Sequence, residues 1–515
     1  MAGEHDGGPR AEQGAAAVAT WAQDAVAAHV TDAEGPVYGI VGLPEEVVAV
    51  ILAYVSRSPK SFRDNLAELM AQDVLDLGAG AAGAPSPPWR HAAERARAFH
   101  ERWVVNYGHA SVAEHATVHL GVEGISRLAS AALETANPFL SFTEYSQRYQ
   151  RPSRGGYVTP PEAEALPADL RQEYEAVQER LFDAYERLLE GVAAHLLDVG
   201  AVRPRPGEEA PATLRRARRR AFEDARYALS LATRTSLGMT ANGRALRDAI
   251  ALMGESPWGE VRDLAMRLRE QGERLLPTLL RHAEPFLPPA ATAPVGPGGA
   301  GAASEGAGTD ADVRLLSAWP EEDGEAIRAL ARTLGLTAAG GAEDPVAFLR
   351  ERRAKAGPHA PAHAAMRAVR YRFALRISEA NWHQLLRHSR GMTLFPAPPG
   401  VGDGVTVPPA VARAGLAAVL EASCADAARV HGQMVAAGAP AVAAYVVTNA
   451  HRRQVVADLD LWELDHLVRL RLRDNAQWDI RRTVRAMVAA AAERHPFLRA
   501  LYGEEVGRPL PDEAV

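Results

Sequence analysis

The chain has 515 residues, which is long enough for two or three domains with large buried cores. Apolar residues make up 47% of it and charged residues 23%, the balance of an ordinary globular protein. The formal net charge is −7, which excludes the overall positive field that is typical of proteins binding DNA or RNA.

Three further features narrow the class of protein. No uninterrupted apolar stretch is long enough to span a bilayer, and the first residues, MAGEHDGGPRAEQG, contain no apolar signal-peptide core. The single cysteine, Cys424, excludes an internal disulfide and a metal site made of cysteines. We therefore expect a cytoplasmic protein with no membrane or nucleic-acid partner and no metal.

Composition shifts divide the chain into four segments. Residues 1–36 read as a flexible tail with a short helix, after which apolar residues recur three and four apart. Residues 285–311 are rich in Pro, Gly and Ala and lack an apolar face, which is typical of a linker. This stretch matches a dinucleotide-binding fingerprint at residues 296–301, but no strand precedes the match and no helix follows it. We expect two lobes, over residues 37–284 and 312–515.

The two lobes resemble each other. The run from Arg226 to Met253 aligns with the run from Ala444 to Arg471, at an offset of 218 residues. The apolar phasing of both runs predicts long helices, and each run continues into another amphipathic helix that ends in Pro-Phe. Helices rich in Ala, Leu and Arg align with one another easily, yet we interpret the match as an internal duplication.

One polar stretch stands out in this alanine- and leucine-rich chain. SFTEYSQRYQ, residues 141–150, has a start that is poor helix material and is followed by Pro152, so we expect a loop. Hydroxyls beside Arg148 suit a phosphate, and Glu144 suits a ribose hydroxyl or a base N–H. The alternative is a capped helix end with a solvated face.

Two clusters are weaker candidates. His115 and His119 lie one helical turn apart near His109, but no third clustered ligand accompanies them, which disfavours a metal site. The run RRARRR at residues 215–220 resembles a nucleic-acid patch, yet acidic residues follow at once, so we interpret it as a solvated face.

Two clusters in the second lobe are stronger. Arg387, His388 and Arg390 follow an apolar run and suit an anionic or planar ligand, although a basic helix end would look the same. The segment RLRLRDNAQWDI places Arg471 and Asn475 in polar surroundings within an otherwise apolar helix, which indicates a site.

Four motifs, in this order, resemble the flavin-dependent thymidylate synthases: GHASVAEH, SFTEYSQRY, TANGR and LRLRDNAQWDI. Members of that family are tetrameric α+β enzymes whose active sites form where subunits meet. They methylate dUMP to dTMP reductively, using FAD, NADPH and methylenetetrahydrofolate. The resemblance implies a helix-rich α+β fold in which two tandem family-like lobes form a pseudo-dimer. It also implies that two chains associate as a homodimer, equivalent to a pseudo-tetramer.

The lobes keep complementary parts of the family's pattern. The family's Arg-His-Arg triplet is replaced by Ala-Asn-Pro at residues 136–138 and survives in part as Arg387-His388-Ser389. The serine-rich stretch occurs only in the first lobe. The phosphate-binding arginine of the family is matched by Arg226 and replaced by Ala444 in the second lobe.

The same division holds further along the chain. The flavin-binding Asn-x-Arg is matched by residues 242–244 and replaced by residues 460–462, Asp-Leu-Trp. The arginine that contacts the pyrimidine ring is matched by Arg471 and replaced by Met253 in the first lobe. Random decay would not sort the losses this way, so we expect one composite site shared between the lobes.

The resemblance assigns residues to two ligands. For dUMP it implies Glu144, Ser146, Gln147, Arg148, Arg226, Gln384, Arg387 and Arg471. For FAD it implies His109, Ser111, Glu144, Asn242, Arg244, Arg387, His388 and Ser389.

The resemblance also implies a mechanism in which Arg471 is the catalytic residue. A preorganised cation at the pyrimidine edge would stabilise the developing enolate. Cys424 lies in an alanine-rich run and is expected to be a core residue, not a nucleophile. Asn475 stands where the family often has histidine, so two alternatives stay open. One is a specialised C5-methylase of another pyrimidine nucleotide such as UMP, and the other is an inactive nucleotide-binding homologue.

Overall fold

The fold comes from a computed structural model of the chain. The structure describes residues 26–32, 34, 38–55, 61, 63–68, 110–281, 283–289, 312–336, 344–355, 361–388 and 391–508. Most of the predicted tail and of the predicted linker therefore lies outside the described residues.

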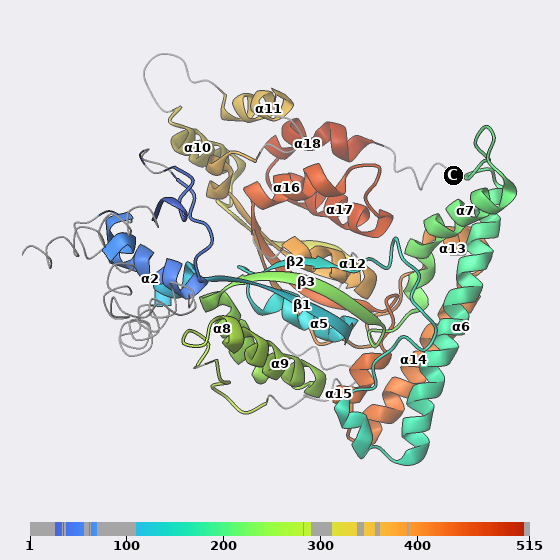
Figure 1. The fold of residues 1–515 in the computed structure, drawn as a ribbon. Helices are drawn as coiled ribbons and strands as arrows, with labels where there is room; N and C mark the ends of the chain where they lie inside the picture. The colour runs from blue at the N-terminus through green and yellow to red at the C-terminus, as the bar shows by residue number, and fades with distance from the viewer. Residues whose placement is uncertain are drawn as a thin grey trace, which may run out of the picture.

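A three-stranded antiparallel sheet organises the first half of the chain (Figure 1). Its strands lie in the order β1 (Thr117–Ser126), β3 (Arg234–Asn242), β2 (Ser141–Glu144). One face packs on a core made with helices α5 (Arg127–Ala136), α8 (Gly243–Gly254) and α9 (Gly259–Leu275), and α2 (Glu45–Val55) extends that core. Alternate residues of β1 and β3 are buried, so only one face of the sheet is covered by this core.

A four-stranded antiparallel sheet organises the second half. Its strands lie in the order β4 (Val313–Trp319), β5 (Arg370–Ser378), β7 (Arg452–Asp460), β6 (Met392–Pro396). The surrounding helices are α10 (Asp323–Leu334), α11 (Pro345–Lys355), α12 (Glu379–Leu385), α16 (Leu461–Arg471), α17 (Trp478–Arg494) and α18 (Phe497–Gly507). The expected helix-rich α+β fold is confirmed.

A layer of long helices joins the two halves along one edge of the molecule (Figure 1). It contains α6 (Ala168–Asp198), α7 (Ala210–Ala225), α13 (Pro409–Arg413), α14 (Ala417–Ala436) and α15 (Pro440–Ala443). Arg180 of α6 contacts Asp426 of α14 at 2.7 Å. Cys424 is buried in this layer, and burial raises the pKa of its thiol to about 11, so the expected core role is confirmed.

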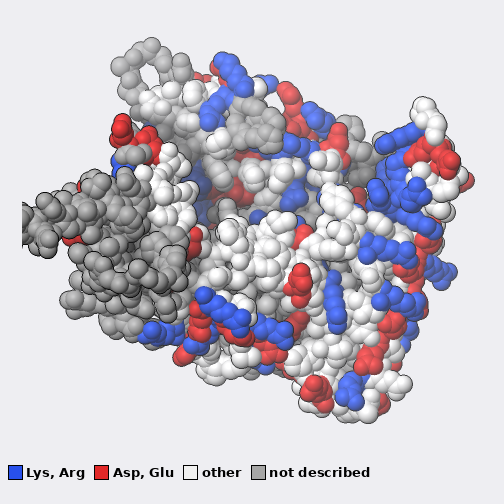
Figure 2. Space-filling model, in the orientation of Figure 1, with Lys and Arg blue, Asp and Glu red and all other residues white. Residues whose placement is uncertain are grey.

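The basic run at residues 215–220 lies on α7. Acidic and basic side chains alternate over the visible face of α6 and α7 (Figure 2). Arg216 pairs with Glu208 at 2.5 Å and Arg218 with Glu190 at 2.7 Å. These pairs support the interpretation of a solvated face.

The structure corrects one prediction about the repeat. The runs from residue 226 and from residue 444 are not continuous helices, because each contains a strand, β3 or β7, before its helix. The segment TRTSLGMTAN of β3 alternates buried and exposed positions with period two, which is the pattern of a half-buried strand. The offset itself holds, since β7 and α16 begin 218 residues after β3 and α8.

Backbone hydrogen bonds join the halves reciprocally. Leu231 N donates to Val447 O at 2.8 Å, and Asn449 N donates to Leu229 O at 2.8 Å. A shift of 218 residues converts the first of these bonds into the second. A further pair is related in the same way, Ala232 N to Tyr445 O at 3.1 Å and Ala450 N to Tyr227 O at 3.0 Å.

Two buried carboxylates repeat this reciprocity with side chains. Tyr227 of the first half donates to Asp479 of the second at 2.8 Å, and Ser378 donates to the same oxygen at 2.5 Å. The mirrored set is Tyr445 and Ser126 donating to Glu260, at 2.9 and 2.5 Å. Each half therefore closes a polar cluster of the other.

No helix in the described part of the chain is both long enough and apolar enough to cross a membrane.

We predict that Asp479→Ala destabilises the protein, whereas Asp479→Asn is nearly tolerated. Alanine leaves the hydroxyls of Tyr227 and Ser378 buried without an acceptor, which costs about 3 kcal/mol. Burial raises the pKa of Asp479, so a neutral amide is a close substitute. The urea midpoint measures the difference, with Glu421→Ala on the exposed face of α14 as control. A midpoint unchanged in Asp479→Ala would contradict the prediction.

Candidate functional site

The candidate site lies where β2 and the turn after it meet the second half of the chain. Glu144, the last residue of β2, is buried and contacts Arg127 of α5 in the same half. It accepts hydrogen bonds from Ser130 at 2.7 Å and Thr235 at 3.1 Å. Arg387 of the second half reaches its other oxygen at 2.6 Å. The two halves therefore share one buried carboxylate.

Two carboxyl groups of this site have opposite electrostatic surroundings. Burial opposes ionisation of Glu144, but Arg127 and Arg387 outweigh it and hold the pKa of Glu144 below its usual value. Burial and the neighbouring Glu144 raise the pKa of Glu134 to about 7. Ser130 lies within 3.3 Å of Glu134 Oε1 as well. Carboxyl groups whose pKa values are pushed apart in this way are typical of functional sites.

A group of arginines gathers beside Glu144. Arg148 donates to Glu223 at 2.9 Å and, through Nη2, to the backbone oxygen of Asn475 at 3.2 Å. Burial, followed by the charge of Arg148, lowers the pKa of Arg226 to about 10. Burial, followed by the charges of Arg387 and Arg148, lowers the pKa of Arg471 to about 10. Buried cations that repel one another favour an anionic ligand.

Three predicted nucleotide-binding residues hold buried polar atoms that have no hydrogen-bond partner among the described residues. They are Nη2 of Arg226, Nε2 of Gln147 and Oε1 of Gln384. The other groups of these side chains are engaged, since Gln147 Oε1 accepts from Asn449 at 3.3 Å and Gln384 Nε2 donates to Gln477 at 3.0 Å. An unpaired buried polar atom is costly, so these atoms indicate a polar ligand.

Arg471 lies at the end of α16 and is held on one edge. Its Nε donates to His388 Nε2 at 3.1 Å, and its Nη2 donates to the backbone oxygen of Gln384 at 3.2 Å. His388 is 6% exposed, and its Nδ1 lies 3.2 Å from Glu463 Oε1. The alignment of this last contact falls short of a hydrogen bond, because Glu463 Oε1 has no partner by that criterion, so we treat it as a polar contact.

The predicted flavin-binding residues are less concentrated. Asn242 caps the N-terminus of α8, where its side chain accepts from Ala245 N at 2.8 Å. Arg244 pairs with Glu114 at 2.6 Å, and Ser111 lies exposed in the short 3₁₀ helix Ala110–Glu114. Two other calls of this group, His109 and Ser389, lie outside the described residues. Ser146 accepts from Arg148 N at 3.3 Å in the turn after β2.

Two adjoining cavities open beside Glu144. One, of about 300 Å³, is lined by Glu134, Leu140, Ser141, Phe142, Glu144, Leu386 and Arg387. The other, of about 490 Å³, lies over the open face of the first sheet and shares Ser141 and Phe142. Gly121 and Gly238 pair at its floor, and a Cβ on either would meet nothing within 4 Å. The glycines therefore leave room for a flat group against the sheet.

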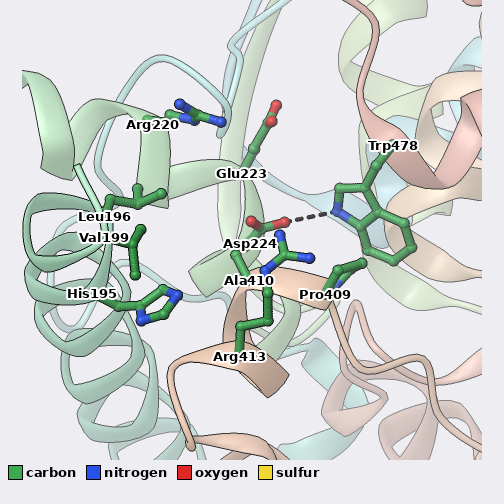
Figure 3. A pocket seen from close by; sticks show the side chains of 10 residues that line it. All are labelled: His195, Leu196, Val199, Arg220, Glu223, Asp224, Pro409, Ala410, Arg413 and Trp478. Atoms are coloured by element: carbon green, nitrogen blue, oxygen red, sulfur yellow. Dashed lines mark hydrogen bonds between the residues drawn. The ribbon is translucent and has the colours of Figure 1, made fainter. Parts of the chain in front are cut away.

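A small cavity lies behind Arg148 and Arg226 (Figure 3). Its wall brings Glu223, the partner of Arg148, beside Asp224, which accepts from Trp478 Nε1 at 2.8 Å. The indole of Trp478 stacks on Tyr227, with ring centroids 5.8 Å apart. At about 30 Å³ the cavity has room for a water molecule, so we interpret this region as a support for the arginines.

His115 and His119 do not form the helical pair that their spacing suggested. His119 lies on β1 and contacts Thr240 at 2.8 Å, whereas His115 follows the 3₁₀ helix. Another group could hold a metal by distance, since ligand atoms of His388, Glu463 and His466 lie within 4.8 Å of one another. Arg471 donates to His388 Nε2, so the neutral ring carries its proton on Nδ1, the atom that faces Glu463. That proton competes with a metal ion.

Several residues of this site were not predicted. Arg127, Ser130 and Glu134 lie on α5, and two of them contact Glu144 directly. Charged residues seven apart in an Ala/Leu helix lie on one face, which was a usable signal. Asn449 and Glu463 carried no local signal, because their roles depend on segments that are distant in sequence.

The lost triplet lies one residue earlier than the alignment suggested. Ser126 and Ser378 cap α5 and α12, with side chains that accept from Ala129 N and Asn381 N. The residues following these matched caps place Thr135, Ala136 and Asn137 opposite Arg387, His388 and Ser389. A helix start is a firmer reference than a loop, so the correspondence begins at residue 135 instead of 136.

Comparisons with known proteins agree with the resemblance. A family model described as thymidylate synthase complementing protein matches residues 47–278 and 359–497. A UPF0159 protein of Thermoplasma acidophilum is 25% identical over 448 residues, which cover 79% of this chain and 88% of that protein. A flavin-dependent thymidylate synthase of Mycobacterium sp. (strain KMS) is 37% identical over 171 residues, covering 33% of this chain and 63% of that protein. A UPF0159 protein of Chlamydia muridarum is 25% identical, and the match spans only 48% of its length.

We predict that Glu134→Gln makes the protein more stable at pH 8 than the unchanged chain, but not at pH 4. The pKa of Glu134 is raised from 4.5 to about 7 on folding. The stability that its protonated form contributes is present below pH 4.5 and is lost as pH rises to about 7, a difference of about 3 kcal/mol.

Urea midpoints measured from pH 4 to pH 8 check this prediction. The gap between Glu134→Gln and the unchanged chain should widen with pH, whereas Glu421→Gln, an exposed control, should show a constant gap. A constant gap for Glu134→Gln would mean that this carboxyl titrates normally.

Proposed function

Because this chain belongs to the thymidylate synthase complementing protein family, we propose that it is a flavin-dependent thymidylate synthase. It converts dUMP to dTMP by reductive methylation, with FAD as cofactor and with methylenetetrahydrofolate and NADPH as co-substrates. The reaction takes place in the cytoplasm, in one composite site built by both halves of the chain.

The observation that carries this proposal is the meeting of the complementary residues around Glu144. Arg387 of the second half lies 2.6 Å from Glu144, and Arg148 of the first half reaches the backbone of Asn475 at 3.2 Å. Arg471 is close enough to Arg148 and Arg387 for their charges to lower its pKa. A nucleotide needs both an anion site and a ring site, and these arginines offer both.

The 5′-phosphate of dUMP binds to Arg148 and Arg226. Nη2 of Arg226 is buried and has no partner within the described segments, so a phosphate oxygen would satisfy it. Gln147 Nε2 supplies a second unpaired donor from the same turn. Binding at the phosphate aligns the pyrimidine ring, since energy from a remote group can be used to orient the reacting atoms.

Arg471 contacts the edge of the pyrimidine. Two of its nitrogens are engaged with His388 and Gln384 O, which leaves Nη1 directed to a ligand. A guanidinium held in advance of the reaction stabilises negative charge that develops on the ring as C5 becomes nucleophilic. Gln384 Oε1 is an unpaired acceptor beside it, suited to the N3–H of uracil.

The residues around the two adjoining cavities fit a flavin. The glycine floor of the larger cavity, Gly121 and Gly238, accepts a flat ring, and Ser141 connects it to the cavity beside Glu144. Asn242 and Arg244 lie beyond Thr240 at the end of β3, where they would hold the polar part of FAD. When bound, FAD supplies the electrons for reduction and carries the one-carbon group.

The two halves act as a pseudo-dimer with one retained site. The lobes 37–284 and 312–515 are its units, and two chains associate as a homodimer. At the reciprocal position, Met253 is 3% exposed and Ala444 is 4% exposed, within one apolar core. The apolar filling supports the idea that the second site was lost while the first was kept.

We predict that the purified protein is yellow from bound FAD and that it oxidises NADPH when dUMP and methylenetetrahydrofolate are added. Comparing dUMP with UMP in this assay decides whether another pyrimidine nucleotide is the substrate. Protein that binds dUMP but neither FAD nor NADPH would instead be a nucleotide-binding homologue.

We predict that Arg471→Ala lowers kcat at least about 100-fold while FAD stays bound, because it removes the cation at the pyrimidine edge. Arg226→Ala should instead raise KM for dUMP, because it removes a phosphate contact. The exposed Arg499→Ala serves as control for both. Unchanged turnover in Arg471→Ala would remove the catalytic assignment.

A further inference from the structure

His388 is enclosed by two residues of one helix. Arg471 and Glu463 lie eight residues apart on α16, so they face the same side of it. His388 Nε2 accepts from Arg471 Nε at 3.1 Å, and His388 Nδ1 faces Glu463 Oε1 at 3.2 Å. Both ring nitrogens are therefore directed to α16, and the imidazole is 6% exposed.

These contacts determine which edge of Arg471 is available. Nε and Nη2 form one edge of the guanidinium fork, and they are engaged by His388 and by the backbone of Gln384. Nη1 makes no hydrogen bond within the part of the chain that the structure describes. The planar fork cannot turn without breaking both bonds, so Nη1 has a fixed direction.

The proton on His388 links Glu463 to this geometry. Because Nε2 accepts from Arg471, a neutral ring carries its proton on Nδ1. Burial, and then the charge of Arg471, lower the pKa of His388, which keeps the ring neutral. Glu463 is the acceptor that faces this proton, and it thereby favours the tautomer that Arg471 needs.

The surrounding packing leaves Glu463 little freedom. Gly391 approaches its carboxylate so closely that a Cβ on this glycine would overlap it. On the far side of His388, His466 packs edge-on at 5.5 Å between ring centroids, and Trp462 stacks on His466. Close packing on several sides is what holds a supporting group in one orientation.

The first half of the chain lacks all three members of this set. The 218-residue offset places Ala245 opposite Glu463 and Met253 opposite Arg471, and the matched helix caps place Ala136 opposite His388. A histidine that served a flavin alone would have no reason to accompany Glu463. The three residues occur together in one half and are absent together from the other.

We propose that Glu463 and His388 are positioning residues that orient Arg471, and that His388 serves Arg471 instead of contacting FAD. This inference rests on the proposed function, because it concerns the ring-binding arginine of that reaction. Glu463 fixes the His388 tautomer, His388 fixes Nε of Arg471, and Nη1 is thereby directed to the pyrimidine.

The test compares four variants with the unchanged chain: Glu463→Ala, Glu463→Gln, His388→Leu and His388→Gln. Glu463→Ala and His388→Leu should lower kcat about 10- to 100-fold with little change in FAD affinity, because a misplaced reacting group costs that much. The Gln variants keep an oxygen for the His388 proton or for Arg471 Nε, so they should recover most of the activity. Glu421→Ala, on an exposed helix face, is the matched control.

Two results would overturn the proposal. If His388→Leu abolishes FAD binding, measured by the flavin absorbance of the purified protein, then His388 contacts the cofactor. If Glu463→Ala and His388→Leu turn over like the unchanged chain, then Arg471 needs no support.

A readout that does not depend on activity separates this inference from the proposed function. ¹⁵N NMR of histidine-labelled protein should show His388, assigned by its absence in His388→Gln, as the Nδ1–H tautomer, and Glu463→Ala should shift it. A protonated Nε2 would contradict the inference even in an active enzyme. Protein that neither binds FAD nor oxidises NADPH, yet shows the Nδ1–H tautomer, would contradict the proposed function and support the Glu463–His388–Arg471 arrangement.

Discussion

The carboxylate of Glu144 is buried between the two halves of the chain, and it stays ionised only because Arg127 and Arg387 are both within reach. A buried charge of this kind is tolerated when cations and hydrogen bonds replace the water that it loses. One of these cations belongs to each half, so the carboxylate requires both halves in one arrangement. The arginines, the cavities and the unpaired polar atoms of the site all lie around this contact.

The backbone is nearly symmetric around this junction, but the side chains are not. Reciprocal hydrogen bonds and the paired Tyr227–Asp479 and Tyr445–Glu260 contacts treat the halves alike. The polar atoms without partners gather on one side, whereas the equivalent positions Met253 and Ala444 are buried in an apolar core. Unpaired polar groups are costly to bury, so they persist where a ligand can satisfy them and are replaced where none binds.

Individual residues show how far prediction from sequence reached. The 218-residue offset, the helix-rich α+β fold, the family and the core role of Cys424 were predicted correctly. The strands β3 and β7 were taken for helix, because short apolar runs fit either period until a partner strand is known. His388 was assigned to a flavin by resemblance, and only its contacts with Arg471 and Glu463 suggest another role.

The sequence by itself determined the repeat and the residue types that each half kept or lost, because these are properties of residue order. Only the tertiary structure decided that Glu144 meets Arg387 across 243 residues, and that Arg148 reaches the backbone of Asn475 across 327. It also decided that Arg127 and Glu134, which look like ordinary helix residues, face the same carboxylate. Contacts between distant segments depend on how whole helices and sheets pack, and no local pattern encodes that packing.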